Sequence, residues 1–161
     1  MRTRYPKAKI TGINGATGGD TTIQGLQRLE EKVLSKKPDL VLIAFGMNDQ
    51  NVGFVPEEQF AANLTSMADR IRRSTSNTEI LLLSSILPNP NWHWTSGKME
   101  EYGAITGQVA KAKNCAFADV LTNWKTVVDR KKPEDLLSNN VNHPNDFGHW
   151  IYFQVLEKLG L

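Results

Sequence analysis

The sequence predicts a three-layer α/β/α sandwich on a mostly parallel sheet, formed by a single domain over residues 1–161. Strand and helix patterns alternate along the chain, which is how parallel sheets are connected. The strand candidates, most clearly residues 40–45, are continuous apolar runs typical of strands buried on both faces. The length of 161 residues and the 40% hydrophobic content suit one domain with one core.

The first half of the chain sets the alternating pattern. Residues 9–14 are a short strand candidate that ends in a glycine- and threonine-rich turn. Asp20 caps a predicted helix over residues 21–35, where apolar side chains recur at helical spacing. The buried strand over residues 40–45 follows, and Pro56 suits the first turn of the next helix.

The second half of the chain continues the alternation of strands and helices. Residues 79–84 form the next buried strand, and the apolar residues between 99 and 109 mark a helix. Residues 115–120 form the last strand, and a closing helix covers residues 150–159. Because ligands bind at the carboxyl ends of parallel strands, we expect the chemistry in the segments that follow the four strands.

Composition excludes several classes of function. A net charge of +2 is too small to predict a nucleic-acid partner. There is no signal-peptide pattern and no apolar run near the roughly 20 residues of a membrane span, so the sequence as given predicts a cytoplasmic protein without a membrane partner. If an upstream segment is missing, a secreted or periplasmic location stays open. We expect no metal and no cofactor.

The segment after the first strand candidate is rich in glycine. In residues 14–20, glycines between a strand and a helix let backbone N–H groups approach an anion at the helix start. A plain tight turn explains the same residues, and the spacing is not that of a nucleotide-binding loop.

The segment after the second strand contains Asn48 and Asp49. An asparagine here carries its amide over the strand ends, where it is able to donate a hydrogen bond to a developing oxyanion. The alternative is an Asn/Asp turn that satisfies its own backbone.

The chain has three histidines. His143 lies in a loop before the last helix, and the proline after it fixes the turn, which suits a general base. His149 is expected to be packed in the closing helix. His93 stands between Trp92 and Trp94, a group that either lines a sugar or acyl site or anchors its loop.

Together these segments resemble the SGNH hydrolases, the GDSL-like esterases and lipases. The resemblance implies a flavodoxin-like sandwich and an oxyanion hole formed by the N–H of Gly19 (Gly18 is the second choice) and the side-chain amide of Asn48. It implies that His143 is the base. Weaker expectations of substrate binding fall on Asp49, Trp92, His93 and Trp94.

The sequence departs from this family in two ways. The Gly-Asp-Ser block that carries the nucleophile is absent, so no nucleophile is found and the domain reads as truncated at its N-terminus. The family's acid position holds Asn140, which brings no charge to stabilise an imidazolium. A Ser-His dyad, or a carboxylate from Asp135 or Asp146, would compensate. Ser84, Ser85 and Thr17 are expected to be structural.

The missing block should occupy the middle of the sheet, between residues 9–14 and the strand over residues 40–45. An open slot would leave rows of backbone groups unpaired. We therefore predict either that residues 9–14 shift inward to pair with that strand, or that a second copy covers the edge in a homo-oligomer.

The expected function is hydrolysis of carboxylic esters, with acetyl or short acyl esters on carbohydrate as the substrate class. One alternative is an inactive remnant or binding module that keeps only the oxyanion and histidine parts of the site. A small flavodoxin-like nucleotide or phosphate binder shares the α/β pattern, but the residues around His143 and Asn48 do not serve phosphate chemistry.

Overall fold

A computed structural model describes residues 5–51 and 55–161, and its sheet has three parallel strands. They are β1 (Leu40–Ala44), β2 (Glu79–Leu83) and β3 (Ala116–Ala118), in the order β1-β2-β3. Each lies within an apolar run predicted to be a strand. The α/β class with a parallel sheet is therefore confirmed, with strands slightly shorter than the runs.

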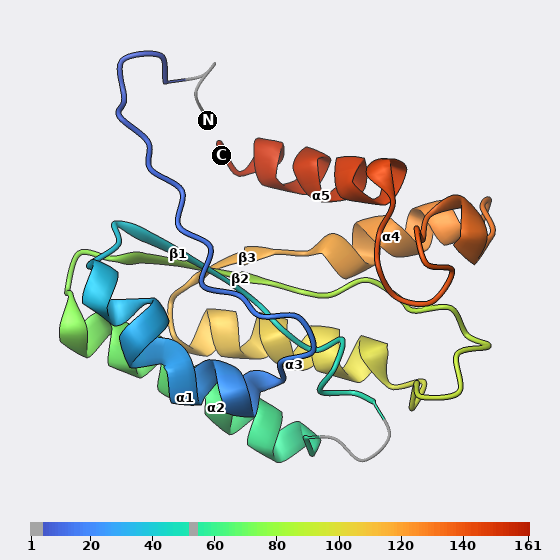
Figure 1. The fold of residues 1–161 in the computed structure, drawn as a ribbon, viewed down its shortest axis with the longest axis horizontal. Helices are drawn as coiled ribbons and strands as arrows, with labels where there is room; N and C mark the ends of the chain where they lie inside the picture. The colour runs from blue at the N-terminus through green and yellow to red at the C-terminus, as the bar shows by residue number, and fades with distance from the viewer. Residues whose placement is uncertain (1–4, 52–54) are drawn as a thin grey trace.

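Three helices cover one face of the sheet: α1 (Thr22–Lys32), α2 (Glu57–Ser74) and α3 (Met99–Ala112). Figure 1 shows them side by side below the strands. Val41 and Ile43 of β1 point into the core on this side. The helix predicted over residues 21–35 divides into α1 and a short 3₁₀ turn, η1 (Leu34–Lys36).

The opposite face carries α4 (Val120–Val128) and α5 (Asp146–Lys158), joined by a segment that includes the 3₁₀ turn η2 (Pro133–Asp135). Their core contains Trp124 and Ile151, which pack with Leu81 and Leu83 of β2. The two faces complete the predicted three layers. Within the described ranges, no helix has the length and apolar character needed to cross a membrane.

The prediction of a strand at residues 9–14 is wrong. These residues form neither strand nor helix, and their backbone groups make no hydrogen bond to the backbone of the other described residues. A single extended segment needs neighbouring strands to be stable. The predicted inward shift to pair with β1 is also wrong, since residues 9–14 do not pair with β1, whose one strand partner among the described residues is β2.

The start of α5 is packed tightly against the segment before it. A Cβ added to Gly148 would lie 2.7 Å from the carbonyl oxygen of Leu136 and 2.8 Å from the Cβ of Pro144. Trp124, which is almost fully buried, would be 3.0 Å away. The absence of a side chain at this position therefore lets α5 dock directly onto the loop that contains His143.

We predict that Gly148→Ala destabilises the protein by about 1–3 kcal/mol, because the overpacking outweighs the roughly 1 kcal/mol that alanine brings to a helix. Urea unfolding followed by circular dichroism measures this difference. Lys158→Ala, at an exposed position near the end of α5, is the control and should change stability by less than about 0.5 kcal/mol. A Gly148→Ala variant as stable as the control would contradict the packing argument.

Candidate functional site

The turn after β1 is built around Asp49. Gly46 begins this turn with φ +116°, a backbone conformation that favours glycine. The carboxylate of Asp49 is fully buried and accepts a hydrogen bond from the Gly46 N–H at 3.0 Å. It also accepts bonds from the backbone N–H and the hydroxyl of Thr22, at 2.8 and 2.6 Å. One carboxylate thus joins the end of β1 to the start of α1.

The donors around Asp49 partly offset the penalty of its burial. Desolvation raises the pKa of this carboxyl, and the bonds from Thr22 and Gly46 act in the opposite direction. Asn63 extends the network, since its side-chain amide donates to the Thr22 hydroxyl at 3.0 Å. The structure gives Asp49 a positioning role in place of the predicted contact with substrate, because its side chain has no exposed surface.

Asn48 joins the glycine segment to the same turn. Its side-chain amide donates to the backbone oxygen of Asp20 at 3.0 Å, directly after Gly19. The amide has a second hydrogen, and the Gly19 N–H makes no hydrogen bond to another described residue. Gly19 has φ +82° and is exposed. The two predicted oxyanion donors therefore lie on segments that are bonded to each other.

Gln50 ties this turn to the tryptophan loop, defined here as residues 92–97, and sequence reasoning missed it. Its side chain is fully buried, and its Oε1 accepts bonds from the Thr95 hydroxyl at 3.0 Å and the Ser96 N–H at 3.1 Å. Trp94 of this loop is 51% exposed, and its ring lies 5.1 Å from that of His93. The sequence carries no signal for this role, because the burial of Gln50 is known only from the structure.

Asn89 connects the segment after β2 to the histidine loop, defined here as residues 138–145. Its backbone N–H donates to the carbonyl oxygen of Val141 at 2.7 Å. Its side-chain amide donates to the backbone carbonyl oxygen of Asn140 at 2.9 Å. Asn139 organises the loop itself, because its Oδ1 accepts the N–H groups of residues 141, 142 and 143, each at 3.0 Å. The backbone that carries His143 is thereby fixed.

The imidazole of His143 is exposed, and the ring makes no hydrogen bond to any described residue. The Oδ1 of Asn140 accepts instead from Asn89 at 3.2 Å, and Asn140 has φ +53°. Asp135 accepts from the backbone N–H of Lys132 and makes no hydrogen bond to the ring of His143. His149, predicted to be packed, is exposed on α5. The described residues thus fix the loop of His143 but not its ring.

The hydroxyls considered as substitutes for the nucleophile have structural roles. Ser84 is buried, and its Oγ accepts the N–H of Leu121 at 3.0 Å at the start of α4. Ser85 hydrogen-bonds Tyr152, whose pKa burial raises to about 12. The Thr17 hydroxyl accepts from the Arg28 guanidinium at 2.8 Å.

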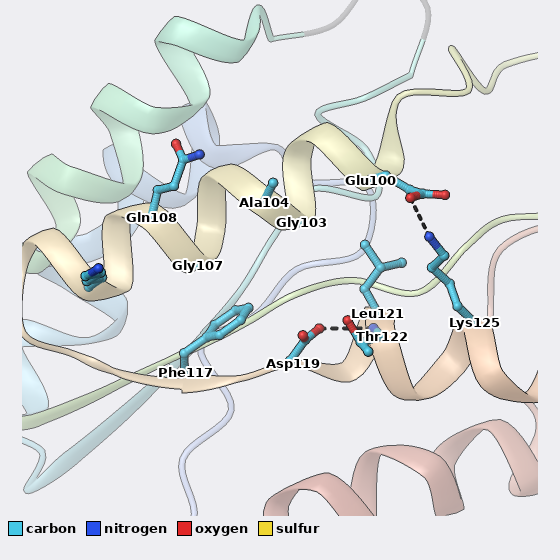
Figure 2. Close-up of a pocket in the computed structure, with 11 residues that line it drawn as sticks. Glu100, Gly103, Ala104, Gly107, Gln108, Phe117, Asp119, Leu121, Thr122 and Lys125 are labelled. Carbon is cyan, nitrogen blue, oxygen red and sulfur yellow. Dashed lines mark hydrogen bonds and ion pairs between the residues drawn. The ribbon is translucent and has the colours of Figure 1, made fainter.

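Two hollows lie on the described part of the molecule. One, of about 450 Å³, runs between α3, β3 and α4, and Figure 2 shows its lining. Lys125 and Glu100 form an ion pair of 2.5 Å at its rim, and Asp119 caps α4 through the N–H of Thr122. It contains none of the predicted site residues. The other, an open hollow of about 460 Å³, is lined by Pro144, next to His143, and by the start of α5.

Comparison with known proteins identifies the family. The GDSL-like Lipase/Acylhydrolase family matches residues 2–151, which is nearly the whole chain. The chain belongs to this family. The recognition of the SGNH pattern from the motifs is therefore confirmed.

Individual relatives agree with this assignment. The acetylxylan esterase of Geobacillus stearothermophilus is 28% identical over 167 residues, covering 97% of this chain and 75% of that protein. Esterase TesA of Pseudomonas aeruginosa is 37% identical over 98 residues, covering 60% of this chain and 47% of that esterase. An arylesterase of Vibrio mimicus is 40% identical over 80 residues, covering 50% and 39%. The chain thus spans three quarters of one relative and less than half of the others.

Solved structures give the same answer for the fold. The acetylxylan esterase structure has a TM-score of 0.84 at 25% identity and covers 98% of this chain and 75% of its own. A lipase/acylhydrolase from Enterococcus faecalis has a TM-score of 0.72 at 25% identity, covering 86% and 69%.

We predict that Asp49→Asn lowers the free energy of unfolding by about 2–4 kcal/mol, because the new amide would turn a donor toward the Gly46 N–H. Chemical denaturation of both proteins measures the difference. Asp39→Asn, at an exposed position, is the matched control and should be close to wild type. Equal losses in the two variants would remove the special role given to the buried carboxylate.

Gln50→Ala is expected to release the tryptophan loop while leaving the sheet in place. The reason is that the Oε1 of Gln50 accepts hydrogen bonds from both Thr95 and Ser96. Hydrogen exchange should be at least about tenfold faster at the Ser96 amide and unchanged at the amides of β2. Gln27→Ala, exposed on α1, is the control. If β2 exchanges faster by the same factor, the effect is global and the loop is not specifically held by Gln50.

Proposed function

We propose that this chain supplies the oxyanion-binding and histidine parts of an esterase that removes acetyl or other short acyl groups from carbohydrate. The observation that carries the proposal is the bond between Asn48 and the Asp20 carbonyl, which brings the Asn48 amide beside Gly19. Two donors on neighbouring segments suit a developing oxyanion. The family assignment and the esterase relatives support the reaction class.

The proposed reaction begins with attack by a serine Oγ on the ester carbonyl carbon, as His143 accepts the serine proton. The carbonyl π electrons move to oxygen, where the Gly19 N–H and the Asn48 amide stabilise the negative charge. Collapse breaks the bond to the alcohol, which leaves with the proton from His143. Water then attacks the acyl carbon while His143 accepts its proton. Collapse breaks the bond between the acyl carbon and the serine Oγ, which takes the proton back from His143 as the acid leaves. The sequence holds no Gly-Asp-Ser, so the serine must come from outside these residues.

The residue at position 140 determines which catalytic arrangement we propose for His143. Among the solved structures of the Geobacillus esterase are catalytic mutants in which an aspartate, or a histidine three positions after it, is replaced by alanine. Asn140 and His143 have the same separation. Because the Asn140 oxygen is bonded to Asn89, we propose that His143 works as part of a dyad. In a serine protease, loss of the acid's charge costs about 10⁴ in kcat.

The tryptophan loop supports the choice of a carbohydrate substrate. Trp94 is half exposed and His93 lies against it, while Trp92 is partly buried. A half-exposed indole offers the flat apolar face against which sugar rings pack, and its N–H remains available for a hydrogen bond. Acetylxylan esterase is also the name of the relative that covers most of this chain.

A second candidate function is ester or sugar binding without hydrolysis. It is favoured by the state of Ser84, Ser85 and Thr17, each of which has a structural hydrogen bond. In that case the isolated chain binds the ester or sugar but does not catalyse hydrolysis. The two candidates share the substrate site and differ only in whether a serine reaches it.

The test combines binding and hydrolysis. We expect an acetylated xylooligosaccharide to shift the NMR signals of Gly19, Asn48 and His143, whereas the deacetylated sugar shifts them less. We expect the isolated chain to hydrolyse p-nitrophenyl acetate no faster than its His143→Ala variant. Asn77→Ala, on an exposed turn before β2, is the control for both measurements.

Two results would contradict the proposal. Absence of any shift at Gly19 and Asn48 would remove the oxyanion assignment. Hydrolysis by the isolated chain that disappears in His143→Ala would mean that a nucleophile lies within these 161 residues, against the assignment of an external serine.

A further inference from the structure

The turn that carries Gly19 is held by few contacts. Gly18 and Gly19 follow one another between Thr17 and Asp20. A Cβ built on either glycine would have no described heavy atom within 4 Å apart from those of its chain neighbours. The backbone bond that closes the turn, from the Asp20 N–H to the Thr17 carbonyl oxygen, is long at 3.3 Å. Packing therefore does not fix this turn, although the turn presents one of the two proposed oxyanion donors.

The pair of glycines leaves the backbone of the turn unusually free. A residue without a Cβ has access to a wide range of backbone conformations, and two such residues in a row multiply this freedom. The direction of the Gly19 N–H depends on the backbone rotations of Gly18 and Gly19, and Gly19 has φ +82°. A donor stabilises an oxyanion best when it is aimed before the charge develops. The quality of this donor therefore depends on how firmly the two ends of the glycine pair are held.

Arg28, on the second turn of α1, holds both ends. Its Nη1 donates to the Thr17 hydroxyl at 2.8 Å, and its Nη2 donates to the Asp20 carboxylate, with which it forms an ion pair. One planar group thus bridges the residue before the glycine pair and the residue after it. The Asp20 carbonyl also accepts from Asn48 at 3.0 Å, so Asp20 is held through both its main chain and its side chain.

The contact between Arg28 and Asp20 differs from an ordinary surface ion pair. Exposed pairs contribute little, because water screens them and both side chains lose freedom when they form. Here the Asp20 side chain is only 14% exposed and that of Arg28 is 33% exposed, and the Thr17 hydroxyl fixes the guanidinium at a second point. The start of α1 is in turn held by the carboxylate of Asp49 through Thr22. Arg28 therefore acts from a firm base.

We propose that Arg28 is a positioning residue that fixes the direction of the Gly19 N–H and so preorganises the oxyanion hole. The inference rests on the proposed function and adds to it a side chain that acts through the glycine turn without touching the ester. The role calls for arginine, because its planar fork presents separate N–H groups to two acceptors. The ammonium of a lysine is a compact charge without such a fork.

The first test measures the glycine turn itself in Arg28→Lys. We expect the NMR order parameter of the Gly19 amide to fall from about 0.85 to below about 0.6. Arg70→Lys is the matched control, because the Arg70 side chain is 32% exposed and its Nη1 donates to α1 at the Leu26 carbonyl, 3.1 Å away, and not to the glycine turn. Millimolar guanidinium added to Arg28→Ala should restore the order of Gly19, whereas methylammonium should not.

The second test measures the effect on the acetyl group. In Arg28→Lys, the affinity for an acetylated xylooligosaccharide should fall about three- to tenfold, which corresponds to one hydrogen bond. The affinity for the deacetylated sugar should stay unchanged, and so should the urea midpoint of unfolding. A residue that served only stability would not separate the two sugars. Arg70→Lys should bind both sugars as the wild type does.

The outcomes separate the inference from the proposed function. An ordered Gly19 in Arg28→Lys, equal disorder in Arg28→Lys and Arg70→Lys, or equal restoration by both added cations would each overturn the role of Arg28. Equal weakening for the two sugars would also overturn it. If the wild type binds both sugars equally while Gly19 is disordered only in the Arg28 variants, Arg28 keeps its hold on the Gly19 N–H and the oxyanion function is refuted.

Discussion

The arrangement of the site depends on the buried carboxylate of Asp49. It accepts hydrogen bonds from the first turn of α1, through Thr22, and from the turn after β1, through Gly46. The Asn48 amide makes a second link, since it holds the end of the glycine segment to the same turn. A buried carboxylate is expensive unless donors surround it, and this one has three. The hydrogen bonds that partly offset its desolvation therefore also bring two parts of the site together.

From Asp49, hydrogen bonds continue along the carboxyl ends of the strands. Gln50 bonds to the tryptophan loop, and Asn89, earlier in the same connection, bonds to the histidine loop. Both residues use amide side chains, which are able to donate and accept at once, and Asn89 also uses its backbone N–H. The predicted site residues, far apart in sequence, thus belong to segments that are joined pairwise by side-chain bonds. A rigid frame of this kind is what a preorganised oxyanion site requires.

Strands and helices with strong apolar patterns could be predicted from the sequence. The prediction failed at residues 9–14. The runs that became β1 and β2 are strands as their apolar composition predicts, but only β2 is buried on both faces, because Leu42 of β1 is 48% exposed. Residues 9–14 would be a strand only with a neighbour, and strand formation depends on such long-range pairing. The roles of Asp49 and Gln50 were likewise out of reach, because a polar residue after a strand has the same pattern whether it binds substrate or backbone. The exposure of His149 depended on how far α5 rotates over the sheet.

The shape of the histidine loop does not depend on a charge at position 140. Three backbone N–H groups converge on the side chain of Asn139, and Asn140 adopts a left-handed conformation that asparagine and aspartate both tolerate. Exchange between asparagine and aspartate at position 140 thus leaves the backbone that carries His143 undisturbed. In evolutionary terms, such an exchange is a nearly neutral step for folding, so a charge is able to appear or disappear beside His143 separately from selection on stability.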